Sequence, residues 1–121
     1  MKIRIKGNSI RYRLTKSEVS ALAATGSIGE ETCFGPDEAQ KFIYAVEVRE
    51  DIDCLAADFK NNTITLFISA AEARSWPDSE RVGFENTLQI APDKTLFLLL
   101  EKDFICMDKT VEDQSDNYPH P

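Results

Sequence analysis

The sequence predicts an α+β fold in which about eight strands form a mostly antiparallel, curved sheet or a small barrel, with two short helices. Three observations indicate this fold: an alternating hairpin at the N-terminus, a similar segment 54 residues further on, and a helix start after each of them. A chain of 121 residues is long enough for one domain with its own hydrophobic core. We expect that domain to span residues 1–104, followed by an acidic, partly extended tail over residues 105–121.

The first 14 residues alternate between basic and apolar side chains around a Gly7-Asn8 turn. A two-residue loop there pairs Lys6 with Ser9 and Arg4 with Arg11. Strand side chains alternate between faces, so one face is apolar, with Ile3, Ile5, Ile10, Tyr12 and Leu14, and the other is basic, with Lys2, Arg4, Lys6, Arg11 and Arg13. Like charges directly opposite each other destabilise a sheet, so we expect water, acids from neighbouring strands or a bound anion beside this basic face.

A shift of 54 positions aligns residues 6–19 with residues 60–73, and then Gly29 with Gly83 and Glu47 with Glu101 without a gap. Few residues are identical, but the turns, the apolar pattern and the helix starts coincide. The pattern predicts a duplicated ββαββ unit, with halves at about residues 1–50 and 55–104. The alternative is a chance likeness between two similar units.

Each helix start carries a capping box, Thr15-Lys-Ser-Glu18 and Ser69-Ala-Ala-Glu72. Gly26 should end the first helix, and Pro77 keeps the second one short. Strands are predicted near residues 28–34, 41–49, 83–90 and 95–103. Residues 95–100 are apolar on both faces after Thr95, which is typical of a central, buried strand.

The charge is distributed unevenly along the chain. Residues 1–16 carry six Lys and Arg and no acid, whereas the whole chain carries 14 basic and 21 acidic residues and a net charge of −7. Such a chain repels phosphate backbones, so we expect no nucleic-acid partner. No apolar run approaches the roughly 20 residues that span a bilayer, and no signal peptide is evident, so we expect no membrane association. The widely spaced Cys33, Cys54 and Cys106 are typical of free thiols in a reducing cytoplasm.

The first candidate site is the basic face. Arginine suits bidentate contact with an oxyanion, so Lys2, Arg4, Arg11 and Arg13 are the predicted contacts to a small anion or an acidic protein surface. The alternative is a solvated face that nearby acids neutralise. Thr65 and Phe67 stand where Arg11 and Arg13 would repeat, and this asymmetry favours a specialised site.

The second candidate site consists of four acids that correspond under the repeat: Glu31 with Glu85, and Glu47 with Glu101. Inside a barrel they could face the basic strands, or they could hold a hard cation such as Mg²⁺ or Mn²⁺ through oxygen; the alternative is ordinary polar positions. His120 and the thiols lack the spacing of a metal site, so we expect no cofactor unless the four glutamates bind a metal ion. We expect Cys33 and Cys106 to be small buried residues and Trp76 to cover the core beside Pro77.

Three segments, the opening MKIRIKGNSIRYRLTKSEV, EETCFG at residues 30–35 and LLLEKDF at residues 98–104, resemble a family of short bacterial proteins that is a domain of unknown function. The resemblance covers nearly the whole chain and implies no activity and no site.

A weaker resemblance, at the level of the fold, is to the triphosphate tunnel enzymes of the CYTH superfamily. It implies basic residues on a polyphosphate and glutamates on Mg²⁺ or Mn²⁺. The Glu-x-Glu-x-Lys signature of those enzymes stands here as Lys2-Ile-Arg4-Ile-Lys6, without either acid.

Three functions follow from these observations. The first is a cytoplasmic bacterial binding module, without catalysis, whose basic face contacts an anion or an acidic partner. The alternative is a small tunnel-type phosphohydrolase or nucleotide-binding protein that needs a divalent metal. The third is a structural protein whose first hairpin docks onto another protein.

Overall fold

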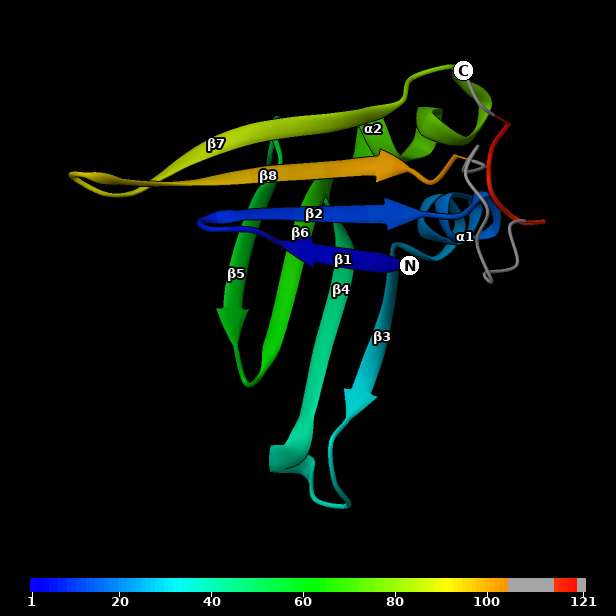
Figure 1. Ribbon diagram of the computed structural model, residues 1–121. Coiled ribbons are helices and arrows are strands. Elements are labelled where there is room, and N and C mark those ends of the chain that lie inside the picture. The colour runs from blue at the N-terminus through cyan, green and yellow to red at the C-terminus, as the bar shows by residue number, and fades with distance from the viewer. Residues whose placement is uncertain (105–114, 120–121) are drawn as a thin grey trace.

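A computed structural model describes residues 1–104 and 115–119 (Figure 1). The first half contains β1 (Lys2–Ile5), β2 (Ser9–Leu14), α1 (Lys16–Thr25), β3 (Ser27–Cys33) and β4 (Lys41–Arg49). The second half contains β5 (Ala56–Lys60), β6 (Thr63–Ser69), α2 (Ala70–Ser75), β7 (Gly83–Ala91) and β8 (Lys94–Lys102). Two 3₁₀ turns, η1 (Glu38–Gln40) and η2 (Trp76–Asp78), precede β4 and follow α2.

The strands form two four-stranded sheets. The first sheet has the order β1-β2-β8-β7 and the second the order β3-β4-β6-β5. All four hairpins are antiparallel, but the central pairs, β2 with β8 and β4 with β6, are parallel. In the described residues the expected α+β class with eight strands and two helices is confirmed, and four of the six strand pairs are antiparallel. The expected single sheet or closed barrel is wrong: there are two sheets, and both are mixed and open. The reason is that α1 and α2 each carry the chain from one sheet to the other, so every hairpin joins a hairpin of the other half (Figure 1).

The pairing of the two sheets supports the predicted duplication. Ser9 pairs with Phe97 in the first sheet, and the positions 54 residues away, Thr63 and Ile43, pair in the second. The third strand of each half departs from this offset. Glu47 pairs with Ser27 and Glu101 with Gly83, so Gly83 corresponds to Ser27 rather than to Gly29. The expected gapless match of Gly29 with Gly83, and of Glu31 with Glu85, is therefore displaced by two residues.

The local signals in the sequence are confirmed, except that the second capping box is not reciprocal, because the Glu72 carboxylate accepts from the Ser69 hydroxyl and not from the Ser69 amide. Lys6 and Ser9 exchange backbone hydrogen bonds of 3.2 Å around the loop, where Gly7 has a positive φ of 55° that suits glycine. Thr15 and Glu18 form the reciprocal capping box of α1, and Gly26 ends the helix in the left-handed conformation. The Ser69 hydroxyl accepts from the Glu72 amide, and α2 ends at Ser75, ahead of Pro77.

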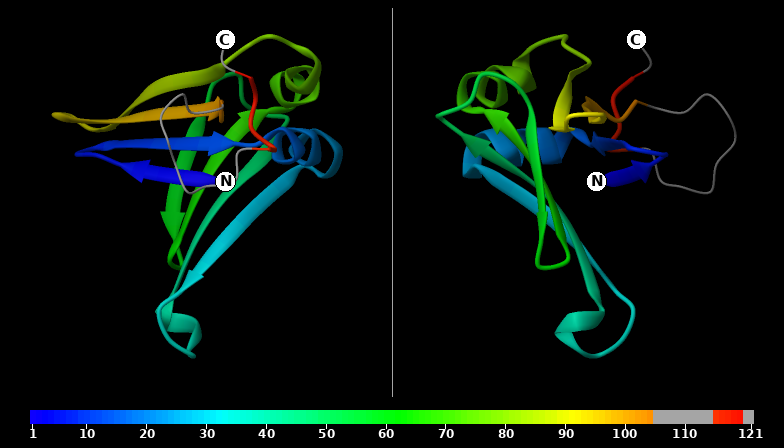
Figure 2. Two further views of the ribbon diagram at one scale, coloured as in Figure 1. Left: turned by 45° about the vertical axis from the view of Figure 1, so that its right-hand side comes forward. Right: turned by 90° about the vertical axis from the view of Figure 1, so that its left-hand side faces the viewer.

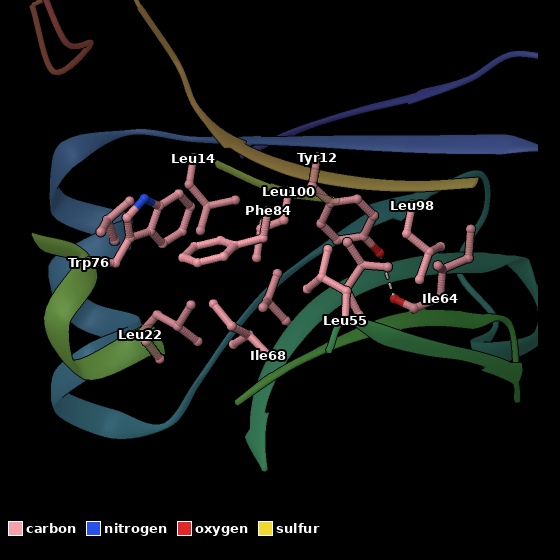
Figure 3. Packing of buried hydrophobic residues seen from close by; sticks show 14 residues of the cluster. Tyr12, Leu14, Leu22, Leu55, Ile64, Ile68, Trp76, Phe84, Leu98 and Leu100 are labelled. Atoms are coloured by element: carbon pink, nitrogen blue, oxygen red, sulfur yellow. Dashed lines mark hydrogen bonds between the residues drawn. The ribbon is translucent and has the colours of Figure 1, made fainter. Parts of the chain in front are cut away.

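The core lies between the two sheets, whose strands cross steeply, and the helices cover one end of it (Figures 1 and 2). Large apolar side chains from both sheets meet there (Figure 3). Trp76 is buried against Phe84, with ring centroids 5.0 Å apart, as expected for a core residue. The Tyr12 hydroxyl of β2 donates a 2.8 Å hydrogen bond to the Ile64 carbonyl of β6, which ties one sheet to the other (Figure 3). Burial raises the pKa of this phenol far above its usual value.

The predicted tail is described only over residues 115–119, so Cys106 and His120 lie outside the described residues. The Tyr118 amide donates to the Asp103 carbonyl at 2.7 Å, and the Tyr118 ring packs on Phe104. The Asp116 carboxylate accepts from the Ser17 hydroxyl at the start of α1. In the described part of the chain, no helix has the length and apolarity to cross a membrane.

We expect Tyr12→Phe to lower the free energy of unfolding by about 1 kcal/mol, because a buried hydrogen bond between the sheets is lost without a change in packing. Urea denaturation measures this change. Tyr44→Phe is the matched control, since its hydroxyl bonds to Glu30 in an exposed setting. Equal and negligible effects of both substitutions would show that the bond between the sheets does not contribute.

Acidification should loosen residues 115–119 from α1. Hydrogen bonds from the Ser17 hydroxyl, and then from Thr15, hold the pKa of Asp116 below its usual value. A carboxylate whose pKa is lowered on folding stabilises the folded state above its unfolded pKa of about 3.9, and this contribution is lost as the pH falls through the lower folded value. An NMR titration should show the Ser17 amide shifting below about pH 4. Asp116→Asn should lack this step, and an identical shift in that variant would assign the transition to another group.

Candidate functional site

The four predicted anion contacts lie together on the outer face of the first sheet. The pairing places Lys2 opposite Arg13 and Arg4 opposite Arg11. With Ile3, these four residues line a pocket of about 180 Å³. The cluster that alternation predicted is therefore present, and its role as an anion site stays a prediction.

Acids at the end of β8 balance part of the basic face. Glu101 Oε1 accepts from Arg11 Nε at 2.6 Å and from Arg13 Nε at 3.1 Å, and the Glu101 side chain is only 13% exposed. Asp103 Oδ2 lies 3.0 Å from Lys2 Nζ. The repulsion between facing cations is thus offset by acids from a neighbouring strand and the residue that follows it, one of the expected possibilities.

Arg4 and Lys6 differ from the other three cations. Their side chains form no ion pair or hydrogen bond with another residue in the described parts of the chain. Both line a second shallow pocket, of about 240 Å³, which continues from the first through Arg4 and Arg11 and reaches Phe97 and Leu99 of β8. The unbalanced positive charge is therefore concentrated on β1 and the turn after it.

In the described part of the chain, Glu101 and Asp103 form ion pairs with cations of the basic face. Glu85 lies on the same face, but it pairs with Leu99, which in turn pairs with Arg11. At the usual spacing between strands, the backbones of Glu85 and Arg11 are therefore about 10 Å apart.

The second sheet provides a comparison within the molecule. At the positions that correspond to Lys2, Arg4, Arg11 and Arg13, it carries Ala56, Asp58, Thr65 and Phe67, in the same strand pairing. Glu47 of β4 stands where Glu101 stands in β8. The second sheet thus forms the same strand pairing with neutral and acidic residues at these positions.

The structure does not bring the four predicted metal ligands together. Glu31 and Glu47 lie on the outer face of the second sheet, and Glu85 and Glu101 on that of the first. The two outer faces point away from each other, and there is no barrel interior for the acids to share (Figure 2). Among the residues described, no group of three or more carboxylates, thiols or imidazoles could hold a metal ion.

Cys33 is exposed, so its expected burial is wrong. It ends an edge strand and faces outward, opposite Lys41, with Sγ 3.7 Å from Glu31 Oε1. Cys54 is also exposed, and neither thiol forms a disulfide.

The sequence pattern does not indicate Asp103 as a partner of the basic face, and it indicates Glu101 only as one of four acids that could face the basic strands. The pairing of β2 with β8 is the information that places them there, and it joins strands from opposite ends of the chain. The likeness between the two halves could have indicated the pairing of β2 with β8, if each hairpin is assumed to pair with a hairpin of the other half.

Glu101→Gln should lower the free energy of unfolding by about 1 kcal/mol, because Arg11 and Arg13 lose a shared, largely buried carboxylate. The difference should shrink in 1 M salt, which screens the remaining repulsion. Urea denaturation at low and high salt tests this. Glu47→Gln is the control at the corresponding exposed position and should have almost no effect; a loss as large as that of Glu101→Gln would contradict the special role of Glu101.

Comparison with known proteins gives a family but no activity. No curated protein and no solved structure matches the chain, so the likeness to the tunnel enzymes gains no support. A family model described as a family of unknown function, DUF7009, matches residues 1–121. The chain therefore belongs to the DUF7009 family.

Proposed function

We propose that this protein is a cytoplasmic binding module, without catalysis, whose basic face binds a small oxyanion such as a phosphate group. The observation that carries the proposal is the pocket between Lys2, Arg4, Arg11 and Arg13, in a protein whose second sheet lacks cations at the corresponding positions. Since the second sheet forms the same pairing without cations at these positions, binding gives a reason for the charges of the first sheet.

The arrangement of the side chains suits this role. Glu101 holds Arg11 and Arg13 in place, so little side-chain freedom is lost when a ligand arrives. Arg4 has no competing acid among the described residues and offers a planar pair of donors that fits an oxyanion. The excess positive charge attracts anions to this face although the whole chain is negative.

A thermal-shift screen tests the proposal directly. The panel is phosphate, pyrophosphate, triphosphate, sulfate and nucleotides, each with and without Mg²⁺ or Mn²⁺. A ligand at about 100 times its dissociation constant adds about 2.7 kcal/mol to the folded state, which is a visible shift. We expect a shift that needs no metal and that declines as the salt concentration rises.

Two variants localise the effect. Arg4→Asp and Arg11→Thr introduce the residues found at the corresponding positions of the second sheet, Asp58 and Thr65, so the fold should tolerate them. Each should reduce anion affinity at least tenfold, which corresponds to one charge-assisted contact of about 1.4 kcal/mol. Arg74→Asp on α2 is the control with the same change of charge at an exposed position.

Three results would contradict the proposal. Equal losses in Arg4→Asp and Arg74→Asp would reduce the effect to net charge. If no anion shifts the unfolding temperature, but the protein captures an acidic protein in a salt-sensitive way that Arg4→Asp abolishes, the face is a docking surface for a macromolecule instead. A shift that appears only with Mg²⁺ or Mn²⁺ would favour the metal-dependent alternative.

A further inference from the structure

An apolar cleft opens between the two sheets at the ends of the strands that lie away from the helices. Its volume is about 470 Å³, and the first sheet contributes the tips of both its hairpins. The lining is almost entirely aliphatic and aromatic, and its main residues are Ile5, Ile10, Phe59, Ile64, Ile90 and Leu96. Asp58 is the one charged residue of the lining, and its carboxylate lies 3.8 Å from Lys60 Nζ.

Exposed apolar side chains gather at this cleft. Six large apolar residues are exposed in the described parts of the chain, and three of them line it: Ile5 at 57%, Phe59 at 67% and Ile90 at 51%. Leaving such side chains in water forgoes the burial energy that each could contribute. Their concentration at one cleft, at the rim of a buried core, is typical of a ligand site rather than of scattered surface residues.

The size of the cleft fits a small molecule. Pockets for small ligands range from about 300 to 1,000 Å³ and are mostly apolar, with few polar groups that fix orientation. Ile64 at 7% exposure provides a buried floor, while the two sheets provide the walls. A volume of about 470 Å³ is large enough for a single hydrocarbon chain.

The charges beside the cleft indicate the head group. Ile10 lines both the cleft and the neighbouring pocket that contains Arg4 and Lys6. Lys6 directly follows Ile5, a rim residue, and neither of these cations forms an ion pair with another described residue. Arg4 and Lys6 belong to the outer face of the first sheet, so a ligand whose hydrocarbon chain lies in the cleft meets positive charge where it passes the tip of the first hairpin.

We propose that the cleft holds the hydrocarbon chain of an amphipathic anion of the fatty-acid class, with its acid group at Lys6 and Arg4. The assignment of the head group rests on the proposed anion-binding function. The assignment of the hydrocarbon chain of the ligand rests on the cleft alone.

Isothermal titration calorimetry with dodecanoate, below its micellar concentration, tests the inference. We expect saturable binding at one site. Phe59→Ser and Ile90→Ser should each weaken it about tenfold or more, because an apolar wall of the site is lost. Phe34→Ser is the matched control, since Phe34 is 75% exposed and does not line the cleft. All three residues are exposed, so the unliganded variants should unfold at similar temperatures.

Two further ligands distinguish the contribution of the hydrocarbon chain to binding from that of the head group. Dodecyltrimethylammonium, with the same chain and a cationic head, should bind at least tenfold more weakly than dodecanoate, and Lys6→Ala should narrow that difference. Inorganic phosphate reports on the basic face alone. Phosphate binding without dodecanoate binding overturns this inference and leaves the proposed function standing, whereas dodecanoate binding that is insensitive to Lys6→Ala and Arg4→Asp overturns the head-group assignment.

The same variants test the other possible occupant. If Phe34→Ser weakens dodecanoate binding as much as Phe59→Ser does, the ligand does not bind in the cleft. A concentration-dependent dimer in sedimentation that Phe59→Ser abolishes, and that dodecanoate does not displace, would mean that a second copy of the chain fills the cleft.

Discussion

The parallel pairing of β2 with β8 and of β4 with β6 is the constraint on which the rest of the structure depends. Without it, each half of the chain would consist of two separate hairpins around a helix, and an isolated two-stranded hairpin is marginally stable in water. The parallel pairs unite these hairpins into two sheets whose apolar faces cover each other. They also bring Glu101 beside Arg13, which makes so dense a basic face tolerable.

The likeness between the two sheets allows the residues that both sheets share to be compared with those that only one sheet carries. The two sheets share strand order, the pairing of their central strands and a glutamate at corresponding places, but only the first sheet concentrates cations around a pocket. In a protein without such symmetry, a charged surface offers no internal reference. Here the second sheet shows what the fold accepts at each position, and the difference between the sheets isolates the residues that need another explanation. The cleft lies between the two sheets and so belongs to both halves.

Local features were predictable because short-range physics decides them. Alternation gave the faces of the first hairpin, the hydroxyl and glutamate pairs marked the starts of both helices, and Pro77 limited α2. The order of the strands was not predictable in the same way. The apolar pattern of residues 95–100 indicates a central strand, but it does not indicate which strands lie on either side of it. The cluster of Lys2, Arg4, Arg11 and Arg13 followed from one hairpin, whereas Glu101 and the apolar cleft depend on contacts across the whole chain.

The two sheets also differ in when they can form during synthesis. The second sheet comes from one continuous stretch, from β3 to β6, so it can assemble while the rest of the chain is still being made. The first sheet joins the earliest strands to the latest, and contacts so distant in sequence form slowly. Until the ribosome has released β8, the apolar face of the N-terminal hairpin is therefore uncovered in the nascent chain. Over the same period, Arg11 and Arg13 lack their partner Glu101. The positive charge that we assign to ligand binding in the finished protein would also keep these unfinished hairpins apart.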